Sequence, residues 1–459
     1  AGCPRCRVHL LELCERAGFA PRIGFEPAAF LLPLFPWQGG IGSRACRVGR
    51  FAIFADCGMG KTPMQIAWAE QVTAHADAPV LILSPLAVSQ QTRREGEKFG
   101  ITVKVCRSQD DVVAGINIAN YEMLEHFDTS AFAGVVLDES SILKSFMGKT
   151  KRAITDAFAD TPYRLSCTAT PSPNDLMELL NQADFLGIMH SNEALSEWFI
   201  ADQSSSGTYR LKGHAEDDFW RWVASWAVAM TKPSDIGYPD DGYQLPALDE
   251  RDVLVDVDLT DGRTDKLFRD VETSATAFNR EKRRTLHDRC AECARIARQA
   301  DGPVAIWCYL NAEADEMKRL MPYAVDVRGS DSPEHKEQAA MDFADGKIPV
   351  LISKPSIFGF GMNFQGCHET IFCGLDYSYE SYYQAVRRFY RFGQRHDVTV
   401  WRVIGKTEEN IMRTIDRKAQ MRDAMDSSIV DAMRKPDVSR PRFSVKGHVS
   451  GMLVPEWVA

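Results

Sequence analysis

The chain has 459 residues and a formal net charge of −9, with 45% hydrophobic and 25% charged residues. This length exceeds one ordinary core and predicts two or three domains. The composition is typical of a soluble globular protein, and no apolar run approaches the roughly 20 residues that span a bilayer. We therefore expect a cytoplasmic protein with no membrane partner. Because the net charge is negative, any surface that binds nucleic acid must be locally basic.

Residues 1–34 form an N-terminal segment whose apolar stretch is too short, and whose charges are too many, for a secretory signal. Four of its residues are metal-ligand types at tight spacing: Cys3, Cys6, His9 and Cys14. A small zinc knuckle is one interpretation, but the last spacings match no established pattern, and we favour a short helix with incidental cysteines. Cys290 and Cys293 form another C-x-x-C pair, in a charged, helix-patterned stretch, and we interpret them as structural.

Short β-type apolar runs alternate with helical patterns over most of the length, which predicts an α/β fold with parallel sheets. The strand candidates of the first half are "RFAIFAD", "APVLILSP", "GINIAN", "AGVVLDE" and "YRLSCTAT". Those of the second half are "GPVAIWCY", "YAVDV", "IPVLISK", "ETIFCG" and "VTVWRVI". The runs are continuously apolar, as in strands covered on both faces, so each half is expected to form its own doubly wound sheet.

Between the halves the composition changes to a tryptophan-rich segment: Trp198, Trp220, Trp222 and Trp226. Aromatic residues at helical spacing usually belong to a core, so we interpret "FWRWVASWAVAM" as an amphipathic helix that buries its tryptophans, in preference to a base-stacking surface. We expect a first sheet domain, a helical tryptophan-rich insertion or linker, a second sheet domain and a C-terminal tail, at residues 35–184, 185–262, 263–435 and 436–459.

The stretch "CGMGKT" follows the apolar run "FAIFAD" and precedes a helical pattern. Strand, glycine loop and helix are the context that a phosphate-binding P-loop requires. Glycines let backbone N–H groups approach phosphate oxygens, and the helix N-terminus adds partial positive charge. Lys61 can reach the β- and γ-phosphates, and Thr62 can hold Mg²⁺. Ala55 replaces the usual first glycine, which is harmless if that position packs away from phosphate. The predicted nucleotide contacts are Gly58, Met59, Gly60, Lys61 and Thr62.

A P-loop needs a carboxylate on a neighbouring strand, and "AGVVLDESS" supplies an acidic pair after four apolar residues. Open α/β sheets place ligands at the carboxyl ends of their strands. We predict that Asp138 is the metal-side carboxylate and that Glu139 polarises the attacking water.

The first half resembles superfamily-two helicases, and within them the SWI/SNF-like ATPases. "FPWQ" resembles the Q motif, in which Gln38 would read adenine, and "LDESS" resembles the acidic box in its SWI/SNF form. "LSPLAVSQQ" and "IANYEML" resemble two motifs that contact nucleic-acid backbone, which implies this role for Pro85, Leu86, Asn120 and Tyr121. "SCTATPSPND" resembles the coupling motif, with Thr168 and Thr170.

The second half continues the resemblance. "VAIWCYL" resembles motif IV, and "GFGMNFQGC" resembles motif V, with Gly361 and Asn363 at nucleotide-contacting positions. "QAVRRFYRFGQ" resembles motif VI, in which Gln384 couples and Arg388 and Arg391 are aimed at ATP. Read alone, this basic stretch is more typical of a solvated patch. Rigid guanidinium groups from another domain are nevertheless well suited to the charge on a transferred phosphate.

The resemblance implies two RecA-like domains in tandem that hydrolyse ATP with Mg²⁺ while bound to nucleic acid, as in phage and prophage helicases of this group. The SWI/SNF form of the motifs favours duplex or branched DNA as partner, with RNA as the alternative. A nucleotide-dependent binding switch with little translocation is the rival function. No protein partner is implied.

Overall fold

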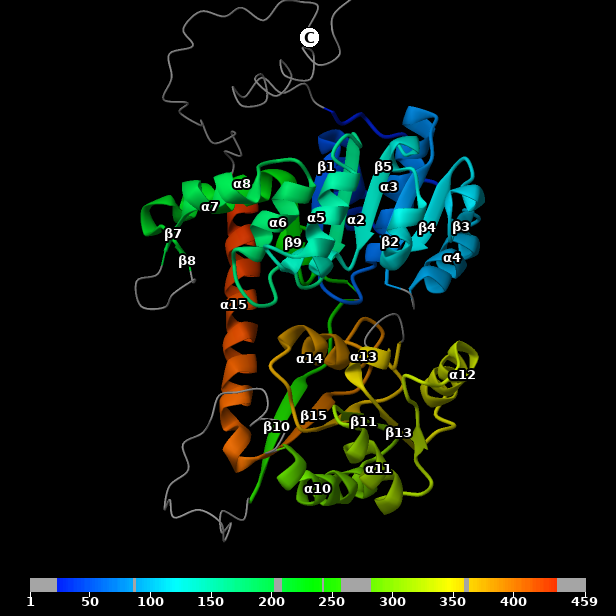
Figure 1. The fold of residues 1–459 in the computed structure, drawn as a ribbon, viewed down its shortest axis with the longest axis vertical. Helices are drawn as coiled ribbons and strands as arrows, with labels where there is room; N and C mark the ends of the chain where they lie inside the picture. Colours follow the sequence, from blue (N-terminus) through cyan, green and yellow to red (C-terminus); the bar gives the residue numbers. More distant parts are fainter. Residues whose placement is uncertain are drawn as a thin grey trace, which may run out of the picture. The chain divides into compact units, whose positions relative to one another are not determined.

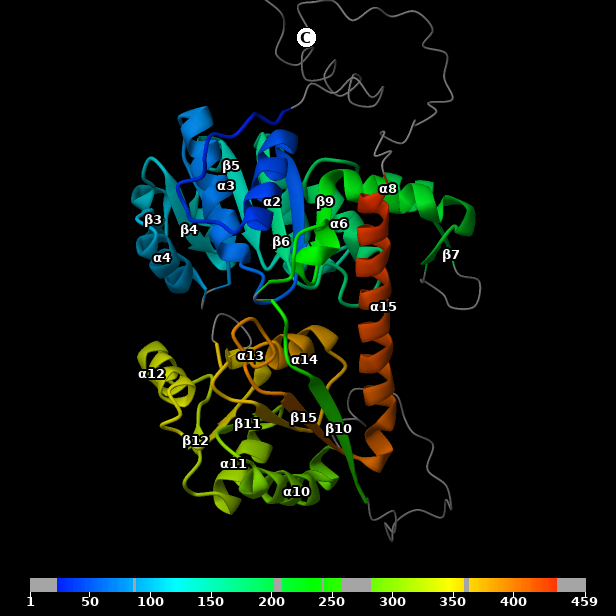
Figure 2. The same ribbon diagram turned by 180° about the vertical axis from the view of Figure 1, so that it is seen from behind.

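The computed structural model describes residues 23–85, 88–201, 209–241, 243–256, 282–358 and 363–435. This part of the chain divides into two compact units (Figures 1 and 2). The first unit comprises residues 23–56, Gly60–Tyr238 and the stretch from Ala424 onward, and the second comprises Cys57–Met59 and Pro239–Asp423. Both are α/β units built on parallel sheets, as the sequence predicts.

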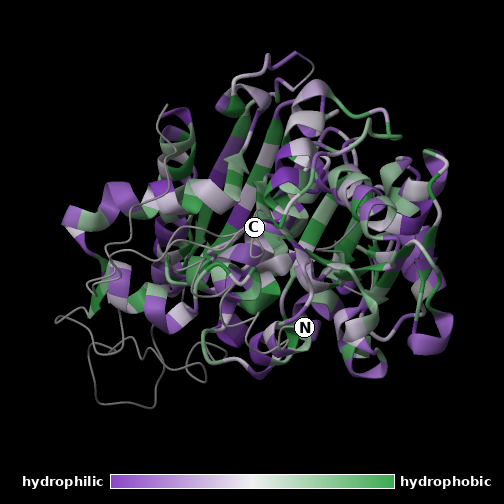
Figure 3. Ribbon diagram, turned by 90° about the horizontal axis from the view of Figure 1, so that it is seen from above, coloured by the Kyte–Doolittle hydropathy of each residue, from purple (hydrophilic) through white to green (hydrophobic). Residues whose placement is uncertain are grey.

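The first unit contains a seven-stranded, fully parallel sheet. Its order is β3 (Val103–Val105), β4 (Ile116–Asn120), β2 (Val80–Ser84), β5 (Gly134–Asp138), β6 (Tyr163–Thr168), β1 (Arg50–Ala55) and β9 (Ala227–Met230). The strands β1, β2, β5 and β6 are almost continuously buried, as expected for strands covered on both faces. The hydropathy colouring of Figure 3 shows the same pattern, with hydrophobic residues gathered on the strands.

The helices of the first unit are α2 (Pro36–Val48), α3 (Lys61–Ala76), α4 (Ser89–Lys98), α5 (Lys149–Ala157), α6 (Glu178–Phe185), α7 (Ser191–Trp198) and α8 (Glu216–Trp226). Short 3₁₀ turns include η2 (Tyr121–His126) and η4 (Ser140–Lys144). A two-stranded antiparallel sheet, β7 (Phe199–Ala201) with β8 (Tyr209–Leu211), follows α7. None of the helices in the described part of the chain is long and apolar enough to span a membrane.

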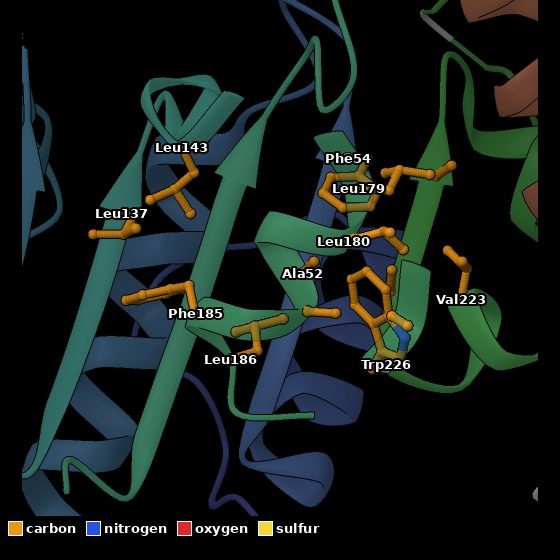
Figure 4. Close-up of a cluster of buried hydrophobic side chains, with 14 of the residues drawn as sticks. Ala52, Phe54, Leu137, Leu143, Leu179, Leu180, Phe185, Leu186, Val223 and Trp226 are labelled. Atoms are coloured by element: carbon orange, nitrogen blue, oxygen red, sulfur yellow. The ribbon is translucent and has the colours of Figure 1, made fainter. Parts of the chain in front are cut away.

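The tryptophans of the middle segment are core residues. Each is at most 8% exposed: Trp198, Trp220, Trp222 and Trp226. Trp226 meets the ring of Phe54 edge-on, with ring centroids 6.1 Å apart, and both gather with Leu179 and Leu180 beside the sheet (Figure 4). Aromatic side chains bury large apolar areas, so this cluster stabilises α6 and α8 against the strand that leads into the P-loop.

The tryptophan segment differs from the expected separate insertion, because it belongs to the first unit up to Tyr238. The end of "FWRWVASWAVAM" is not helical: α8 ends at Trp226, and the next four residues form β9, paired with β1. The apolar run "AVAM" fits a buried strand at this sheet position, where it adds main-chain hydrogen bonds beside the P-loop strand.

The second unit contains a six-stranded parallel sheet. Its order is β10 (Leu248–Val255), β15 (Val398–Gly405), β14 (Glu369–Cys373), β11 (Val304–Cys308), β13 (Val350–Ser353) and β12 (Val325–Asp326). Its helices are α10 (Leu286–Gln299), α11 (Asn311–Leu320), α12 (Pro333–Ala344), α13 (Pro355–Phe358), α14 (Tyr379–Val386) and α15 (Glu409–Arg434), of which α15 extends past Asp423. The strand β10 lies within residues 185–262, which the sequence assigns to the linker.

The core of the second unit contains a buried ion pair. The Arg289 guanidinium donates to Glu313 Oε1 at 2.8 Å and to the carbonyl of Cys373 at 2.8 Å, and neither charged side chain is exposed. Cys290 and Cys293 are fully buried on the same helix, which agrees with a structural role. The zinc-knuckle alternative concerns Cys3 to Cys14 and lies outside the described residues, as does the tail from residue 436.

Candidate nucleotide-binding site

The P-loop joins β1 to α3 and has the backbone of a phosphate cradle. Gly58 and Gly60 have φ angles of +86° and +68°. This is the left-handed region, where a residue with a side chain would be strained and glycine is not. Gly60 is also the N-cap of α3. The Lys61 ammonium donates to the carbonyls of Ala55 at 2.9 Å and Asp56 at 3.4 Å. The lysine thus lies within the curl of its own loop, where it can exchange carbonyl oxygens for phosphate oxygens.

Ala55 explains why the missing first glycine is tolerated. It is the last residue of β1, and its side chain is fully buried. Only its carbonyl turns toward the loop, where it accepts the bond from Lys61. A methyl group at this position packs in the core and leaves the phosphate side of the loop unchanged.

The acidic box ends β5, two strands from the P-loop strand. The strand β6 lies between them, paired with β5 through Asp138↔Cys167 and with β1 through Phe54↔Thr168. All three strands are parallel, so the P-loop, the acidic box and Thr168 share one edge of the sheet. Open parallel sheets bind ligands at this edge.

Gln65 holds Asp138 in place, a role that the motif analysis missed. Its Nε2 donates to Asp138 Oδ1 at 2.7 Å, and both side chains are buried. The Glu139 amide donates to the same oxygen at 3.1 Å. Burial raises the pKa of the Asp138 carboxyl, while the bond from Gln65 and the charge of Lys61 lower it. The sequence contains one sign of this role: Gln65 follows Thr62 by three residues on the same helix, which places the two side chains on one helix face.

Glu139 adopts a φ of +53°, unusual for a residue with a side chain. It is the N-cap of the 3₁₀ turn η4. Such backbone strain persists only where the surroundings fix it. Here the Tyr121 hydroxyl donates to the Asp138 carbonyl at 2.7 Å, on the residue just before Glu139.

A buried polar network fixes η4 and was also missed by the sequence analysis. Ser166 Oγ of β6 donates to Ser140 Oγ at 2.8 Å, and Gln182 Nε2 of α6 donates to the Ser140 carbonyl at 3.0 Å. Asn181 Nδ2 donates to the Leu143 carbonyl at 2.9 Å. Buried polar groups that satisfy one another specify a single arrangement, so β6 and α6 together hold the turn after Glu139.

Gln38 lies against the P-loop. Its Oε1 accepts the Phe35 amide at 3.0 Å, which orients the side-chain amide. A Cβ built at Gly60 would lie 2.3 Å from Gln38 Nε2, so only glycine allows this approach. The Q-motif glutamine and the phosphate loop are therefore neighbours. Met59, another residue of the loop, is buried.

The predicted nucleic-acid motifs are joined by hydroxyl groups. Ser89 Oγ lies 3.0 Å from Ser84 Oγ, at the end of β2, and donates to Asn120 Oδ1 at 3.0 Å. Pro85 directly follows β2, and Leu86 lies outside the described residues. The Tyr121 hydroxyl reaches the acidic box, so it links this region to the nucleotide side of the sheet.

Thr168 and Thr170, which the sequence analysis predicts to be coupling residues, are buried at the end of β6 and just after it. The Thr170 amide donates to Thr168 Oγ1 at 3.0 Å, and Thr170 Oγ1 has no hydrogen-bond partner within the described ranges. Most buried hydroxyl groups in folded proteins form a hydrogen bond, and a bound ligand or an ordered water would supply one here.

In the second unit, motifs V and VI are tied together. Gln365 Nε2 donates to the Phe392 carbonyl at 2.6 Å, and Gln394 Nε2 donates to the Cys367 carbonyl at 2.9 Å. Gln384 and Arg388 are largely buried, Arg391 is half-buried and Asn363 is exposed. Gly361 lies outside the described residues.

The residues at the acidic box fit the way in which proteins hold Mg²⁺ with nucleotides, through one or two carboxylates plus substrate phosphates. Asp138 would supply the carboxylate and Thr62 a hydroxyl. No cluster of three or more Asp, Glu, His or Cys side chains suited to a metal occurs among the described residues.

Comparison with known proteins supports the helicase resemblance. The model of the helicase conserved C-terminal domain matches residues 283–393. The chain is 22% identical to putative protein p41 of Acyrthosiphon pisum secondary endosymbiont phage 1, over 87% of this chain and 98% of that protein. It is 23% identical to the uncharacterized ATP-dependent helicase YqhH of Bacillus subtilis, over 84% of this chain and 78% of that protein.

Among solved structures, the Sulfolobus solfataricus SWI2/SNF2 ATPase core in complex with dsDNA matches with a TM-score of 0.43 and 18% identity, over 88% of this chain and 96% of that chain. The match to the helicase C-terminal domain and the two relatives matched over most of their length support the predicted resemblance to superfamily-two helicases.

Proposed function

We propose that this protein hydrolyses Mg-ATP and couples hydrolysis to movement along duplex or branched DNA. The observation that carries the proposal is the bond from Gln65, on the P-loop helix, to Asp138 of the acidic box. It joins the two halves of a nucleotide site and presets the geometry between them. Such preorganisation favours phosphoryl transfer, because positioning and electrostatic stabilisation supply most of the catalysis of this reaction.

In this proposal Lys61 neutralises the β- and γ-phosphates, and the backbone around Gly58, Met59 and Gly60 cradles them. Thr62 and Asp138 would hold Mg²⁺, which would offset the negative charge that develops on the transferred phosphate. Glu139 orients and deprotonates the attacking water, and its fixed backbone supports that role. Gln38 reads the adenine edge.

The second unit contributes the residues that sense and complete the nucleotide state. Arg388 and Arg391 stabilise charge on the transferred γ-phosphate, and Gly361 and Asn363 contact the nucleotide. Gln384 couples this unit to hydrolysis together with Thr168 and Thr170. The bonds that tie motif V to motif VI support the proposal, because a guanidinium group that acts on a transition state must be held rigidly.

Nucleic acid would contact Pro85, Leu86, Asn120 and Tyr121 of the first unit, mainly through phosphates. The hydroxyl links from Ser89 to Asn120 and from Tyr121 to the acidic box support communication between the two sites. Binding that depends on phosphate contacts should weaken steeply with salt.

We further propose translocation without vigorous unwinding of long duplexes. Strand separation needs a wedge, and the tryptophans of the middle segment are buried core residues that cannot serve as one. The exposed candidate in the first unit is the small sheet β7–β8, in which Ile200 is 45% and Tyr209 37% exposed.

Two substrates test this proposal under identical ATP and salt: a triplex-forming strand on duplex DNA, and a long strand annealed in a fork. Displacement of the triplex strand without release from the fork is expected. Efficient release from the fork would refute the proposal and point to β7–β8 as the wedge. Duplex RNA as a competitor for ATPase stimulation separates DNA from RNA, and stronger stimulation by RNA would overturn the choice of DNA.

A further inference from the structure

The chain enters the second unit through a short segment that precedes β10 and runs beside motif VI. At the end of this segment, the Ala247 amide donates to Asp397 Oδ1 at 2.9 Å. The Val398 amide in turn donates to the Ala247 carbonyl at 2.9 Å, just ahead of the parallel pairing of β10 with β15. The entry segment, residues 243–247, therefore lies alongside residues 392–398 within the second unit.

An aromatic pair joins the entry segment to motif VI. The Tyr243 ring stacks on the Phe392 ring, with centroids 4.6 Å apart and planes 26° from parallel. The Tyr243 amide donates to the Asp240 carbonyl at 2.8 Å, so the backbone also holds the tyrosine in place. Tyr243 is half-buried, and burial raises its pKa to about 12. Offset-stacked rings attract each other beyond the area that they bury, so this contact restrains the Phe392 ring.

Phe392 is held from a second side through its backbone. Gln365 Nε2, from motif V, donates to the Phe392 carbonyl at 2.6 Å. The next residue, Gly393, has a φ of +92°, and a Cβ there would lie 3.1 Å from Gln365 Nε2. Glycine adopts this φ without strain and gives the glutamine room. Two segments that are distant in the chain thus hold one residue, by its ring and by its carbonyl.

Arg391 lies one peptide bond before Phe392 and shares its turn. The Arg391 amide donates to the Phe389 carbonyl at 3.1 Å, and the Arg391 carbonyl accepts the Gln394 amide at 3.0 Å. Phe389 is fully buried in the core of the second unit. The Arg391 backbone is therefore anchored to the core on one side and depends on Phe392 on the other. A misplacement of about 1 Å at a reacting group can slow a reaction on the order of 10²-fold.

We propose that Tyr243 is a positioning residue for Arg391: its ring holds Phe392, and Phe392 sets the turn from which the arginine reaches the transferred phosphate. This inference rests on the proposed role of Arg391 in ATP hydrolysis and adds a residue that lies outside the helicase motifs. The ring carries the effect, because the stack involves the ring and not the hydroxyl. Since Tyr243 acts through Arg391, its loss should slow the chemical step and leave nucleotide binding intact.

Single-turnover hydrolysis and ATP affinity, measured on the full chain with saturating duplex DNA, test this role. Tyr243→Ala should slow hydrolysis roughly 10-fold at unchanged ATP affinity, because it loosens the turn without removing the arginine. Tyr243→Phe keeps the stack and should match the wild type. Tyr323→Ala, which removes a 54% exposed tyrosine from the same unit, is the matched control and should also match the wild type.

Three results would overturn the proposal. They are a wild-type rate in Tyr243→Ala, a slower rate that weaker ATP binding explains, and an equal loss of rate in Tyr243→Phe. Circular dichroism of each variant checks that the chain is folded.

A double variant separates positioning from a general loss of stability. In the Arg391→Ala background, the further change Tyr243→Ala should leave the rate of hydrolysis unchanged, since no guanidinium remains to be positioned. The same fold loss in both backgrounds would mean that Tyr243 acts by another route, and it would refute the proposal.

Hydrogen exchange without nucleotide distinguishes failure of this inference from failure of the proposed function. The amides of residues 391–394 should exchange faster in Tyr243→Ala than in the wild type, Tyr243→Phe or Tyr323→Ala, because the turn is released. Unchanged exchange would overturn the proposal whatever the turnover. Faster exchange together with normal turnover in Arg391→Ala would contradict the proposed role of the arginine and, with it, the catalytic part of this inference, while Tyr243 would still hold the turn.

Discussion

Replacement of Gln65 by leucine should raise the Mg²⁺ requirement of ATP hydrolysis without removing any group that touches ATP. The substitution deletes the 2.7 Å bond that Gln65 Nε2 donates to Asp138 Oδ1. A hydrogen bond to a charged group contributes about 1.5–3 kcal/mol, and the loss falls on the ionised form of the carboxyl. Since 1.4 kcal/mol is a factor of ten, the Mg²⁺ concentration for half-maximal activity should rise roughly 10- to 100-fold.

The assay is steady-state ATP hydrolysis at saturating ATP and DNA across a Mg²⁺ titration. Gln71→Leu is the matched control: Gln71 is a buried glutamine on the same helix, and its Oε1 accepts the Ala28 amide at 2.8 Å, away from the acidic box. The control should keep the wild-type Mg²⁺ requirement even if it loses stability. An unchanged requirement in Gln65→Leu, with normal folding by circular dichroism, would show that Gln65 does not position Asp138.

Three further predictions concern the same site. Lys61→Ala should lose ATP affinity and turnover together, whereas Glu139→Gln should keep nucleotide binding and lose hydrolysis. Binding is measured with a fluorescent ATP analogue. An equal loss of binding in both variants would contradict the role of Glu139 as the base. Burial raises the pKa of the Asp138 carboxyl, and a metal binds the ionised form. Mg²⁺ affinity should therefore fall as the pH drops. The fall should begin at a higher pH than it would for an ordinary aspartate, whose pKa is about 3.9. Mg²⁺ titrations at stepped pH check this, and an affinity flat down to pH 5 would contradict it. Arg391→Ala should keep ATP binding and slow single-turnover hydrolysis by on the order of 10³-fold if it stabilises the transition state, so a normal rate would exclude it from catalysis.

The sequence was sufficient for the nucleotide loop and for the central strands because their signals are local. Gly58, Gly60 and Lys61 follow a buried strand directly, and Asp138 ends another, so position along the chain predicts position at the sheet edge. The buried tryptophans were likewise readable from helical spacing.

The elements that the sequence analysis missed depend on contacts between distant residues. The strand β10 is largely exposed and carries the charged run "LDERDV", so its pattern does not predict a strand. It forms because it pairs along its whole length with β15, and Arg402 Nη2 donates to Asp252 Oδ2 at 2.9 Å across that pair.

The polar network of Ser140, Ser166 and Gln182 illustrates the same limit. Each residue is unremarkable in its own segment, and only the packing of α6 on the sheet brings the three together.

The measurement that tests the central claim most directly is steady-state ATP turnover by the full chain with and without saturating duplex DNA, with Glu139→Gln as the inactive control. The proposed coupling predicts low turnover alone, strong stimulation by duplex DNA, loss of that stimulation as salt rises, and no turnover in the control. Turnover that is the same with and without nucleic acid would contradict the motor function and leave a nucleotide-dependent switch as the better account.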